Sequence, residues 1–227
     1  MKLDTLQENI GYNFKNIKLL EHALRHSSYV NEHRLSKSDC NERLEFLGDA
    51  VLELVSSEFL YKKYAARAEG ELSKTRAALV CEPSLSSDAK KIDLGSYIFM
   101  GKGEEASGGR ERASVVSDAF EALIGAMFLD GGLEPAKAFI ERFVLVDADD
   151  KLIITDSKSA LQELVQQHRK AVIEYTTIEE SGPEHDKCFV VSVKINGKDA
   201  GTGSGRSKKA AEKQAALNAI KNLKGLN

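Results

Sequence analysis

The sequence predicts an all-α N-terminal domain followed by a small C-terminal α+β domain of order α-β-β-β-α. Apolar residues follow a helical period almost throughout residues 1–146, and β-rich alternation appears only after residue 170. The charge divides in the same region: residues 155–227 hold 12 Lys+Arg and 9 Asp+Glu, net +3, and the remainder holds 20 and 26, net −6. The overall net charge of −3 would alone disfavour a nucleic-acid partner, but it averages two opposite parts.

Length and composition place the chain among ordinary globular proteins. Its 227 residues are 42% hydrophobic and 30% charged, which suits one large or two smaller domains. The cysteines are Cys40, Cys81 and Cys188, without a CxxC, so we expect reduced thiols in a cytoplasmic protein. The N-terminus leads into no apolar signal region, and no stretch approaches 18 uncharged apolar residues. We therefore expect neither a signal peptide nor a membrane partner.

Helical periodicity and turn residues define the elements of the first domain. Helices are expected near residues 17–25, 42–62, 71–90, 115–129 and 134–145. The segment Gly101-Lys102-Gly103 lacks the spacing of a phosphate-binding loop and a preceding strand, so we expect a flexible loop. His22 and His26 are four residues apart, but no Glu follows His22, which favours packing or capping roles over a metal site.

The second domain follows a short polar linker. We place the first domain at 1–146, the linker at 147–155 and the second domain at 156–227. In the second domain we expect a helix at 157–170, strands at 171–178 and 187–195, a Gly-rich third strand and a helix at 207–224. Asn196-Gly197 is a strong signal for a tight hairpin between the second and third strands.

An acidic stripe marks the helix at 42–62. At about 100° per residue, one narrow face of this helix carries Glu42, Glu45, Asp49 and Glu53. The opposite face is expected to be apolar and to consist of Leu47, Ala50, Val51 and Leu54. A solvated acidic face is the simplest explanation for this helix alone. Gly48 costs about 1 kcal/mol relative to Ala in a helix, although it also permits close packing against another helix.

A second acidic pair lies in the otherwise apolar helix at 115–129. Its only strongly polar residues are Ser117, Asp118 and Glu121, so the helix is expected to be buried. A buried ion pair is the structural alternative, but two acids would need two cationic partners. Two helices that present acids three or four residues apart supply hard oxygen ligands, which favour Mg²⁺ or Mn²⁺ over zinc. The candidate catalytic carboxylates are Glu45, Asp49, Asp118 and Glu121.

At these residues the sequence resembles bacterial ribonuclease III. Residues 41–52 (NERLEFLGDAVL) match the signature of that family almost letter for letter, and residues 101–110 and 118–132 also resemble it. The resemblance covers essentially the whole chain, with both domains in the same order. One departure is Arg25, where the family more often has a small polar residue.

The resemblance implies a Mg²⁺-dependent homodimeric endonuclease, with Mn²⁺ as a substitute metal, that cuts double-stranded RNA. Each protomer would hold one acidic site and leave 5′-phosphate, 3′-hydroxyl and short 3′ overhangs. By resemblance Glu45, Asp118 and Glu121 are metal ligands, and loss of Asp49 or Glu121 should damage the chemistry most. Glu42 and Glu69 match acidic positions that the family places at the valley shared by the two protomers and at the dimer face. Processing of ribosomal RNA precursors and some mRNAs is the expected role.

The last helix of the chain has lysines at its unfavourable end. Ser207 is a good N-cap, and Lys208 and Lys209 lie in the first turn, where cations oppose the helix dipole. A bound phosphate would reverse this penalty. The alternative is an exposed lysine pair that only keeps the surface soluble, but the unfavourable end of the helix makes this alternative weaker. With the α-β-β-β-α order, this segment resembles a double-stranded RNA-binding domain.

Such a domain spans about 16 base pairs and reads A-form shape. The resemblance implies three groups of RNA contacts: Ser159, Gln162 and Glu163 in one minor groove, Pro183, Glu184 and His185 in the next, and Lys208, Lys209 and Lys213 on the phosphates between. A lone loop histidine such as His185 is, however, often simply exposed.

Two other classes of function are alternatives to the endonuclease. One is a catalytically silent protein that only binds double-stranded RNA; such a protein would have lost acids at the metal positions, and here all four are present. The other is a dimeric scaffold whose acids only pair with basic partners, which leaves the lysines of the second domain unexplained.

Overall fold

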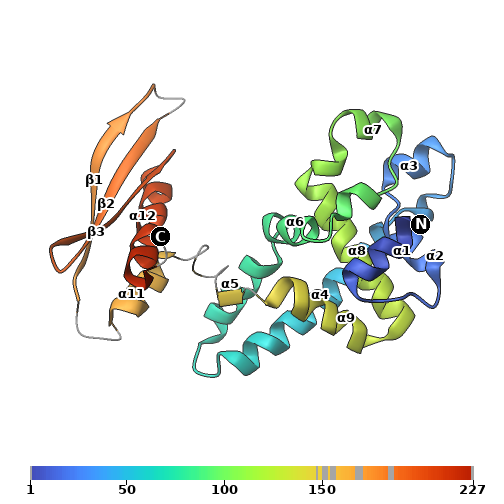
Figure 1. The fold of residues 1–227 in the computed structure, drawn as a ribbon, viewed down its shortest axis with the longest axis horizontal. Coiled ribbons are helices and arrows are strands. Elements are labelled where there is room, and N and C mark those ends of the chain that lie inside the picture. Colours follow the sequence, from blue (N-terminus) through green and yellow to red (C-terminus); the bar gives the residue numbers. More distant parts are fainter. Residues whose placement is uncertain are drawn as a thin grey trace. The chain divides into compact units, whose positions relative to one another are not determined.

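The computed structural model describes residues 2–146, 148–149, 153, 157–166, 171–183 and 187–225. The chain divides into two compact units, Met1–Ala148 and Asp149–Asn227. The first is helical, and the described elements of the second include a three-stranded sheet flanked by the helices at 157–166 and 208–224, as predicted (Figure 1). Among the described residues, no helix is both long enough and apolar enough to cross a membrane.

The first unit is a bundle of helices joined by short turns. Its α-helices are α1 (Lys2–Ile10), α2 (Ile17–Ala23), α3 (Ser27–Glu32), α4 (Glu42–Lys63), α5 (Glu69–Val80), α6 (Glu82–Lys90), α7 (Lys102–Ala106), α8 (Ala113–Gly131) and α9 (Leu133–Ile140). A π-helical turn, Glu141–Leu145, continues α9. Short 3₁₀ turns cover Lys37–Asp39, Leu94–Tyr97 and Gly109–Glu111.

Helix α8 is the central element of this unit. It packs against α2, α4, α6 and α9 (Figure 1), and its side chains at Phe120, Leu123 and Ile124 are completely buried. The prediction of a buried apolar helix is therefore confirmed. Its two acids therefore project from a helix that is buried along most of its length.

The buried face of α4 differs from the predicted one. Of the four residues predicted to form the apolar face, only Val51 is buried; Leu54 is 59% exposed, and Ala50 is also exposed. The buried residues are instead Leu44, Gly48, Val51, Leu52, Val55, Ser56 and Leu60. The prediction placed the buried face directly opposite the acids. In the structure the buried face is centred near Gly48, which packs against α8.

Two further predictions about the first unit were wrong. The helix expected at 71–90 is two helices, because the backbone at Cys81 is extended and Pro83 lies in the first turn of α6. The segment at Gly101, expected to be a flexible loop, instead leads into α7. Its backbone N–H groups at Gly101 and Lys102 donate to Ser28 Oγ at 2.9 Å and Glu32 Oε2 at 2.7 Å.

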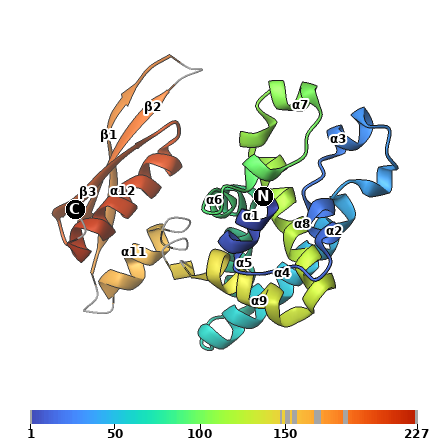
Figure 2. The same ribbon diagram turned by 45° about the vertical axis from the view of Figure 1, so that its right-hand side comes forward.

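The second unit has the predicted order of elements. Antiparallel strands β1 (Ile173–Ser181), β2 (Cys188–Ile195) and β3 (Lys198–Gly205) follow α11 (Ser157–Gln166) and precede α12 (Lys208–Lys224). Both helices lie on one side of the sheet (Figure 2). Asn196 and Gly197 have positive φ angles of 51° and 76°, as the tight hairpin requires. The part of the first helix expected at 167–170 lies outside the described residues.

Small residues bring α12 close to β3. A Cβ atom at Gly201 would lie 2.7 Å from the backbone N of Ala219, and one at Gly205 would lie 2.7 Å from that of Ala211. The facing residues Ala211, Ala215 and Ala219 are fully buried. The Gly-rich character of the third strand therefore allows the helix to pack directly on the backbone of the sheet.

Candidate active site and nucleic-acid interface

The close crossing of α4 and α8 places the two acidic pairs together. A Cβ atom at Gly48 would overlap the carbonyl oxygen of Glu121, and one at Gly125 would overlap that of Leu44. The backbone of α8 thus fills the space that a side chain would need on α4. This explains why the sequence tolerates a glycine in the middle of α4, and it positions Glu45 and Asp49 beside Asp118 and Glu121.

The carboxyl groups at the crossing repel one another. Burial, followed by the charges of Asp49 and Glu45, raises the pKa of Glu121 to about 8. Burial and the charge of Asp118 also raise the pKa of Glu45. The site therefore holds more negative charge than its own surroundings compensate, which is the property of an acidic site that binds a cation.

The pKa of Asp118 shows which other groups surround the site. Burial raises it first and the charge of Glu82 raises it further, while His26 and a hydrogen bond from Ser117 lower it. His26 and Glu82 come from α3's N-cap and the start of α6. The sequence did not predict either residue at the site, because both are far from Asp118 along the chain and come near it only through the packing of the helices.

His22 and His26 both make structural contacts. His26 caps α3: its Nδ1 accepts the N–H of Ser28 at 3.3 Å. His22 Nε2 lies 2.9 Å from the carbonyl oxygen of Cys40. The expected capping and packing roles are confirmed.

The donor set suits a hard divalent cation. Carboxylates are the preferred ligands of Mg²⁺ and Mn²⁺, and a cation would offset the mutual repulsion that adds to burial in raising these pKa values. Among the described residues, no three acidic, histidine or cysteine side chains already converge at metal-ligand distances. The carboxylates share one site, and side-chain rotation would be needed to bring their oxygens onto one ion.

The remaining acids predicted near the site lie at different places. Glu42 is exposed at the start of α4, and its charge acts on Glu45 and Asp118. Glu69 lies at the start of α5, accepts a hydrogen bond from Ser73 at 2.7 Å, and lines a groove of about 440 Å³ with Leu54 and Tyr61. The structure therefore places Glu42 beside the four carboxylates and Glu69 on the groove face.

Glu53, the last acid of the stripe, has a cationic partner of its own. Its Oε2 lies 2.6 Å from Nε of Arg76 on α5, and the same arginine donates to Ser57 Oγ at 2.7 Å. This ion pair distinguishes Glu53 from the four candidate carboxylates.

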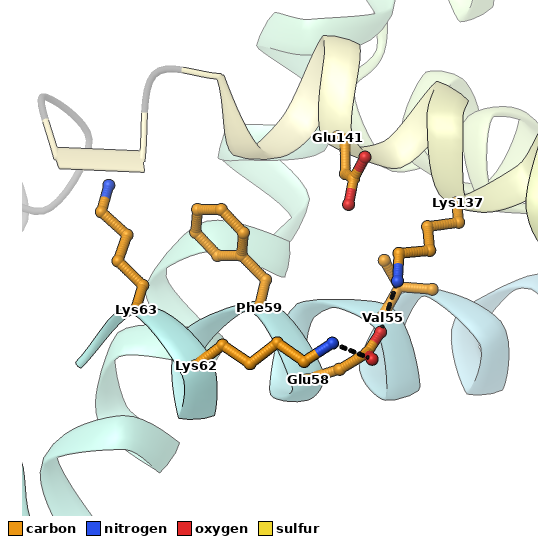
Figure 3. A pocket seen from close by; sticks show the side chains of 7 residues that line it. All are labelled: Val55, Glu58, Phe59, Lys62, Lys63, Lys137 and Glu141. Atoms are coloured by element: carbon orange, nitrogen blue, oxygen red, sulfur yellow. Dashed lines mark hydrogen bonds and ion pairs between the residues drawn. The ribbon is translucent and has the colours of Figure 1, made fainter. Parts of the chain in front are cut away.

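A lysine-rich cavity of about 290 Å³ lies between α4 and α9 (Figure 3). Glu58 accepts from Lys62 at 2.5 Å and from Lys137 at 2.7 Å. The hydrogen bond from Lys137, followed by that from Lys62, lowers the pKa of Glu58 to about 2. Because one carboxylate already binds two of the lysines, this cluster joins the two helices rather than offering free cations.

The second unit presents the predicted RNA-contact residues on its surface. Ser207 caps α12 as predicted, its Oγ accepting the N–H of Ala210 at 3.2 Å. Exposed side chains include Ser159, Gln162, Glu163, Pro183, Lys208, Lys209 and Lys213. Lys208 Nζ lies 3.9 Å from a Glu180 oxygen. Glu184 and His185, which were predicted to enter a minor groove, lie outside the described residues.

Comparisons with known proteins agree with this architecture. Residues 16–148 match the family model "Ribonuclease-III-like", and residues 157–223 match "Double-stranded RNA binding motif". Ribonuclease 3 of Listeria monocytogenes is 50% identical over 222 residues, which cover 97% of both chains. Ribonuclease 3 of Bacillus licheniformis is 51% identical over 219 residues, covering 96% of this chain and 88% of that protein.

Solved structures resemble the first unit. The nuclease domain of Campylobacter jejuni ribonuclease III, at 2.2 Å resolution, aligns with a TM-score of 0.59 and 48% identity, covering 65% of this chain and 97% of that one. A second structure of the same domain, with the same TM-score and identity over 63% of this chain and 95% of that one, concerns flexibility in a region involved in dimer formation. The chain therefore belongs to the ribonuclease III family of endoribonucleases and carries a double-stranded RNA-binding motif.

Proposed function

We propose that the chain hydrolyses double-stranded RNA at the crossing of α4 and α8 with Mg²⁺ as cofactor, Mn²⁺ substituting. The observation that carries this proposal is the group of mutually repelling carboxylates held beside the glycine contact. In the proposed site Glu45, Asp118 and Glu121 bind the metal, and Asp49 contributes the fourth carboxylate on which the chemistry depends. A bound Mg²⁺ supplies an activated water and charge stabilisation for the leaving oxygen.

The protein's own residues determine where that chemistry takes place. Glu121 projects from a helix whose side chains are buried along most of its length, and its carboxylate lies close enough to Asp49 and Glu45 for their charges to raise its pKa. Protonation of Glu121 would remove a metal ligand, and its raised pKa makes the metal-free site more readily protonated than an ordinary carboxylate. The expected products carry 5′-phosphate and 3′-hydroxyl ends with short 3′ overhangs.

Product analysis tests this function. A perfect RNA duplex labelled at each end is incubated with the protein in Mg²⁺, Ca²⁺ or EDTA, and the new ends are mapped and tested for a 5′-phosphate. We expect cleavage with 5′-phosphate ends in Mg²⁺, binding without cleavage in Ca²⁺, and no cleavage in EDTA. Binding of the duplex without any cleavage in Mg²⁺ or Mn²⁺ would favour the alternative, a catalytically silent RNA-binding protein.

We further propose that the chain acts as a homodimer through the exposed face of α4. On this face Phe46 is 79% exposed, Leu54 59% and Tyr61 74%, an unusual density of large apolar side chains for a surface. The groove that Leu54, Tyr61 and Glu69 line lies beside them. The Campylobacter jejuni relative has a region involved in dimer formation in its nuclease domain. The same helix therefore presents its acids toward α8 and its apolar stripe toward a second copy.

Charge on this stripe is expected to separate the protomers. The double substitution Phe46→Asp with Leu54→Asp would place two carboxylates in the proposed interface, so sedimentation velocity should report half the mass of the parent protein. Leu35→Asp, at another surface position that is 42% exposed, is the matched control and should leave the mass unchanged. A parent protein that sediments as a monomer at micromolar concentration would contradict the dimer.

We propose that the N-terminal end of α12 binds RNA phosphates, with α11 in one minor groove and the segment at Pro183 in the next. The capped helix end leaves backbone N–H groups available to an anion, and the exposed Lys208 and Lys209 add charge there. Cytoplasmic processing of ribosomal precursor stems and some mRNAs is the proposed role of the full chain.

Removal of these lysines is expected to weaken RNA binding and its salt dependence. For Lys208→Ala with Lys209→Ala, the slope of log affinity against log salt should fall by about 2, one for each lost phosphate contact. Lys221→Ala with Lys224→Ala, at the opposite end of the same helix, is the matched control and should keep the slope. An identical slope in the first variant and the parent would refute the phosphate contacts.

A further inference from the structure

The start of α11 is joined to the N-terminal half of α12 by two hydrogen bonds from consecutive residues. Ser157 is fully buried, and its Oγ donates to the carbonyl oxygen of Lys213 at 2.6 Å. The next residue, Lys158, donates from Nζ to Glu212 Oε2 at 2.6 Å. Neighbouring residues of one helix therefore bind neighbouring residues of the other, which fixes both the distance and the rotation between the helices.

The sheet contributes a third element to this joint. Lys158 Nζ lies 4.5 Å from the centroid of the Tyr175 ring on β1, within the range of a cation–π contact. The Tyr175 hydroxyl is buried and has no hydrogen-bond partner among the described residues. Burial and the charge of Glu212 raise the pKa of Tyr175 to about 12, so the ring remains a neutral platform for the ammonium group.

The joint lies between the two proposed RNA-contact surfaces. Ser159 and Gln162 follow it on α11 and line a groove of about 390 Å³ with Lys158 and Tyr175. On α12, Lys213 supplies the carbonyl that Ser157 binds, while its exposed side chain belongs to the proposed phosphate contacts. The joint therefore connects the proposed groove-reading surface to the proposed phosphate-binding surface.

We propose that Ser157, Lys158 and Glu212 are positioning residues that hold these two surfaces at the spacing of an A-form duplex. The proposal rests on the RNA-binding function proposed above for α11 and α12. Double-stranded RNA is stiff and its grooves recur at fixed intervals, so a module with the correct spacing before binding loses less free energy on association. In this arrangement the charge of Lys158 acts within the protein and does not contact a phosphate.

Salt-dependent binding separates positioning from direct contact. Full-length protein carrying Glu121→Gln, which we expect to prevent cleavage, is titrated in Ca²⁺ with a perfect RNA duplex over a range of salt concentrations. Lys158→Met should weaken binding about fivefold, which corresponds to the free energy of one exposed ion pair and one cation–π contact. The salt slope should be unchanged. A slope that falls by about 1 would show a direct phosphate contact and overturn the proposal.

A charge exchange provides the matched control. Lys158→Glu alone should weaken binding, and Lys158→Glu with Glu212→Lys should recover most of the lost affinity because the pair is restored in reverse. In the cleaving protein, Lys158→Met should raise KM and leave kcat unchanged. Parent-like binding by Lys158→Met, or no recovery in the exchanged pair, would overturn the positioning role.

A separate variant tests the RNA surface on which the proposal rests. Lys209→Ala should lower the salt slope by about 1. If Lys209→Ala lowers the slope while Lys158→Met binds like the parent, the positioning role is refuted and the proposed RNA surface stands. If Lys209→Ala also leaves affinity and slope unchanged, the proposed RNA surface is refuted, and the positioning role with it.

Discussion

Gly48→Ala is expected to destabilise the first unit by about 3 kcal/mol, the upper range for overpacking a close contact, and to reduce cleavage severely. The added methyl group would overlap the carbonyl oxygen of Glu121 and lie 3.0 Å from the backbone N of Gly125. Both obstacles are backbone atoms of a buried helix, so no side chain can rotate away to make room. The helices must separate, which moves Glu45 and Asp49 away from Asp118 and Glu121.

Chemical denaturation followed by circular dichroism measures this loss, and the cleavage rate of duplex RNA measures the effect on the site. Gly70→Ala is the matched control: it also lies in a helix, and nothing is within 4 Å of the added Cβ atom. There alanine should be neutral or stabilise by up to about 1 kcal/mol. Equal stability of Gly48→Ala and the parent would mean that the helices do not cross as closely as described.

Glu121→Gln is expected to lower the cleavage rate by about a thousandfold or more, equivalent to about 4 kcal/mol of transition-state stabilisation, while duplex binding persists. The amide keeps the size of the side chain but removes the negative charge from the proposed metal site. Glu53→Gln is the matched control, because that acid belongs to the same stripe but pairs with Arg76. Normal turnover by Glu121→Gln, or an equal loss in Glu53→Gln, would refute the assignment of the ligands.

The same substitution should change the pH dependence of stability in metal-free protein. The pKa of Glu121 is raised from 4.5 to about 8 by burial and then by Asp49 and Glu45. Between these values the folded protein retains a proton that the unfolded chain has released, so stability falls as pH rises through that window. Melting temperatures from pH 4.5 to 8 in EDTA should decline less steeply in Glu121→Gln. Parallel pH profiles of the two proteins would contradict the raised pKa.

The sequence predicted the elements of the fold better than the faces on which they pack. The buried helix α8 and the α-β-β-β-α order were confirmed, because strong periodicity and composition are local properties. The predicted apolar face of α4 was wrong because two of its members, Ala50 and Leu54, are exposed, as are Phe46 and Tyr61 on the same helix. A single sequence does not distinguish an apolar stripe that faces the core from one that faces solvent.

Long-range contacts also explain the prediction that failed around Gly101. Its glycines suggested a loop, yet Arg110 Nη1 donates to the carbonyl oxygens of Gly95 and Ile98, and Glu32 binds the start of α7. These partners come from distant parts of the chain and are invisible to local propensity. The segment they brace leads directly into α8.

The candidate site was also predicted only in part from the sequence. The spacing of acids on two helices indicated Glu45, Asp49, Asp118 and Glu121, and the structure places these four at one crossing. The sequence alone gave no reason to separate Glu53 from them; the ion pair with Arg76 does so. The proximity of His26 and Glu82 to Asp118 likewise depends on the packing of α3 and α6.

The most direct test of the central claim is the single-turnover rate of duplex RNA cleavage as a function of Mg²⁺ concentration. Protein freed of metal is bound to a labelled perfect duplex, and the reaction is started by Mg²⁺. The acidic site at the α4–α8 crossing predicts no cleavage in EDTA, a rate that rises and saturates with Mg²⁺, and a rate that stays near zero in Glu121→Gln at every concentration. Cleavage in EDTA at the rate measured in saturating Mg²⁺ would contradict the proposed metal-dependent mechanism.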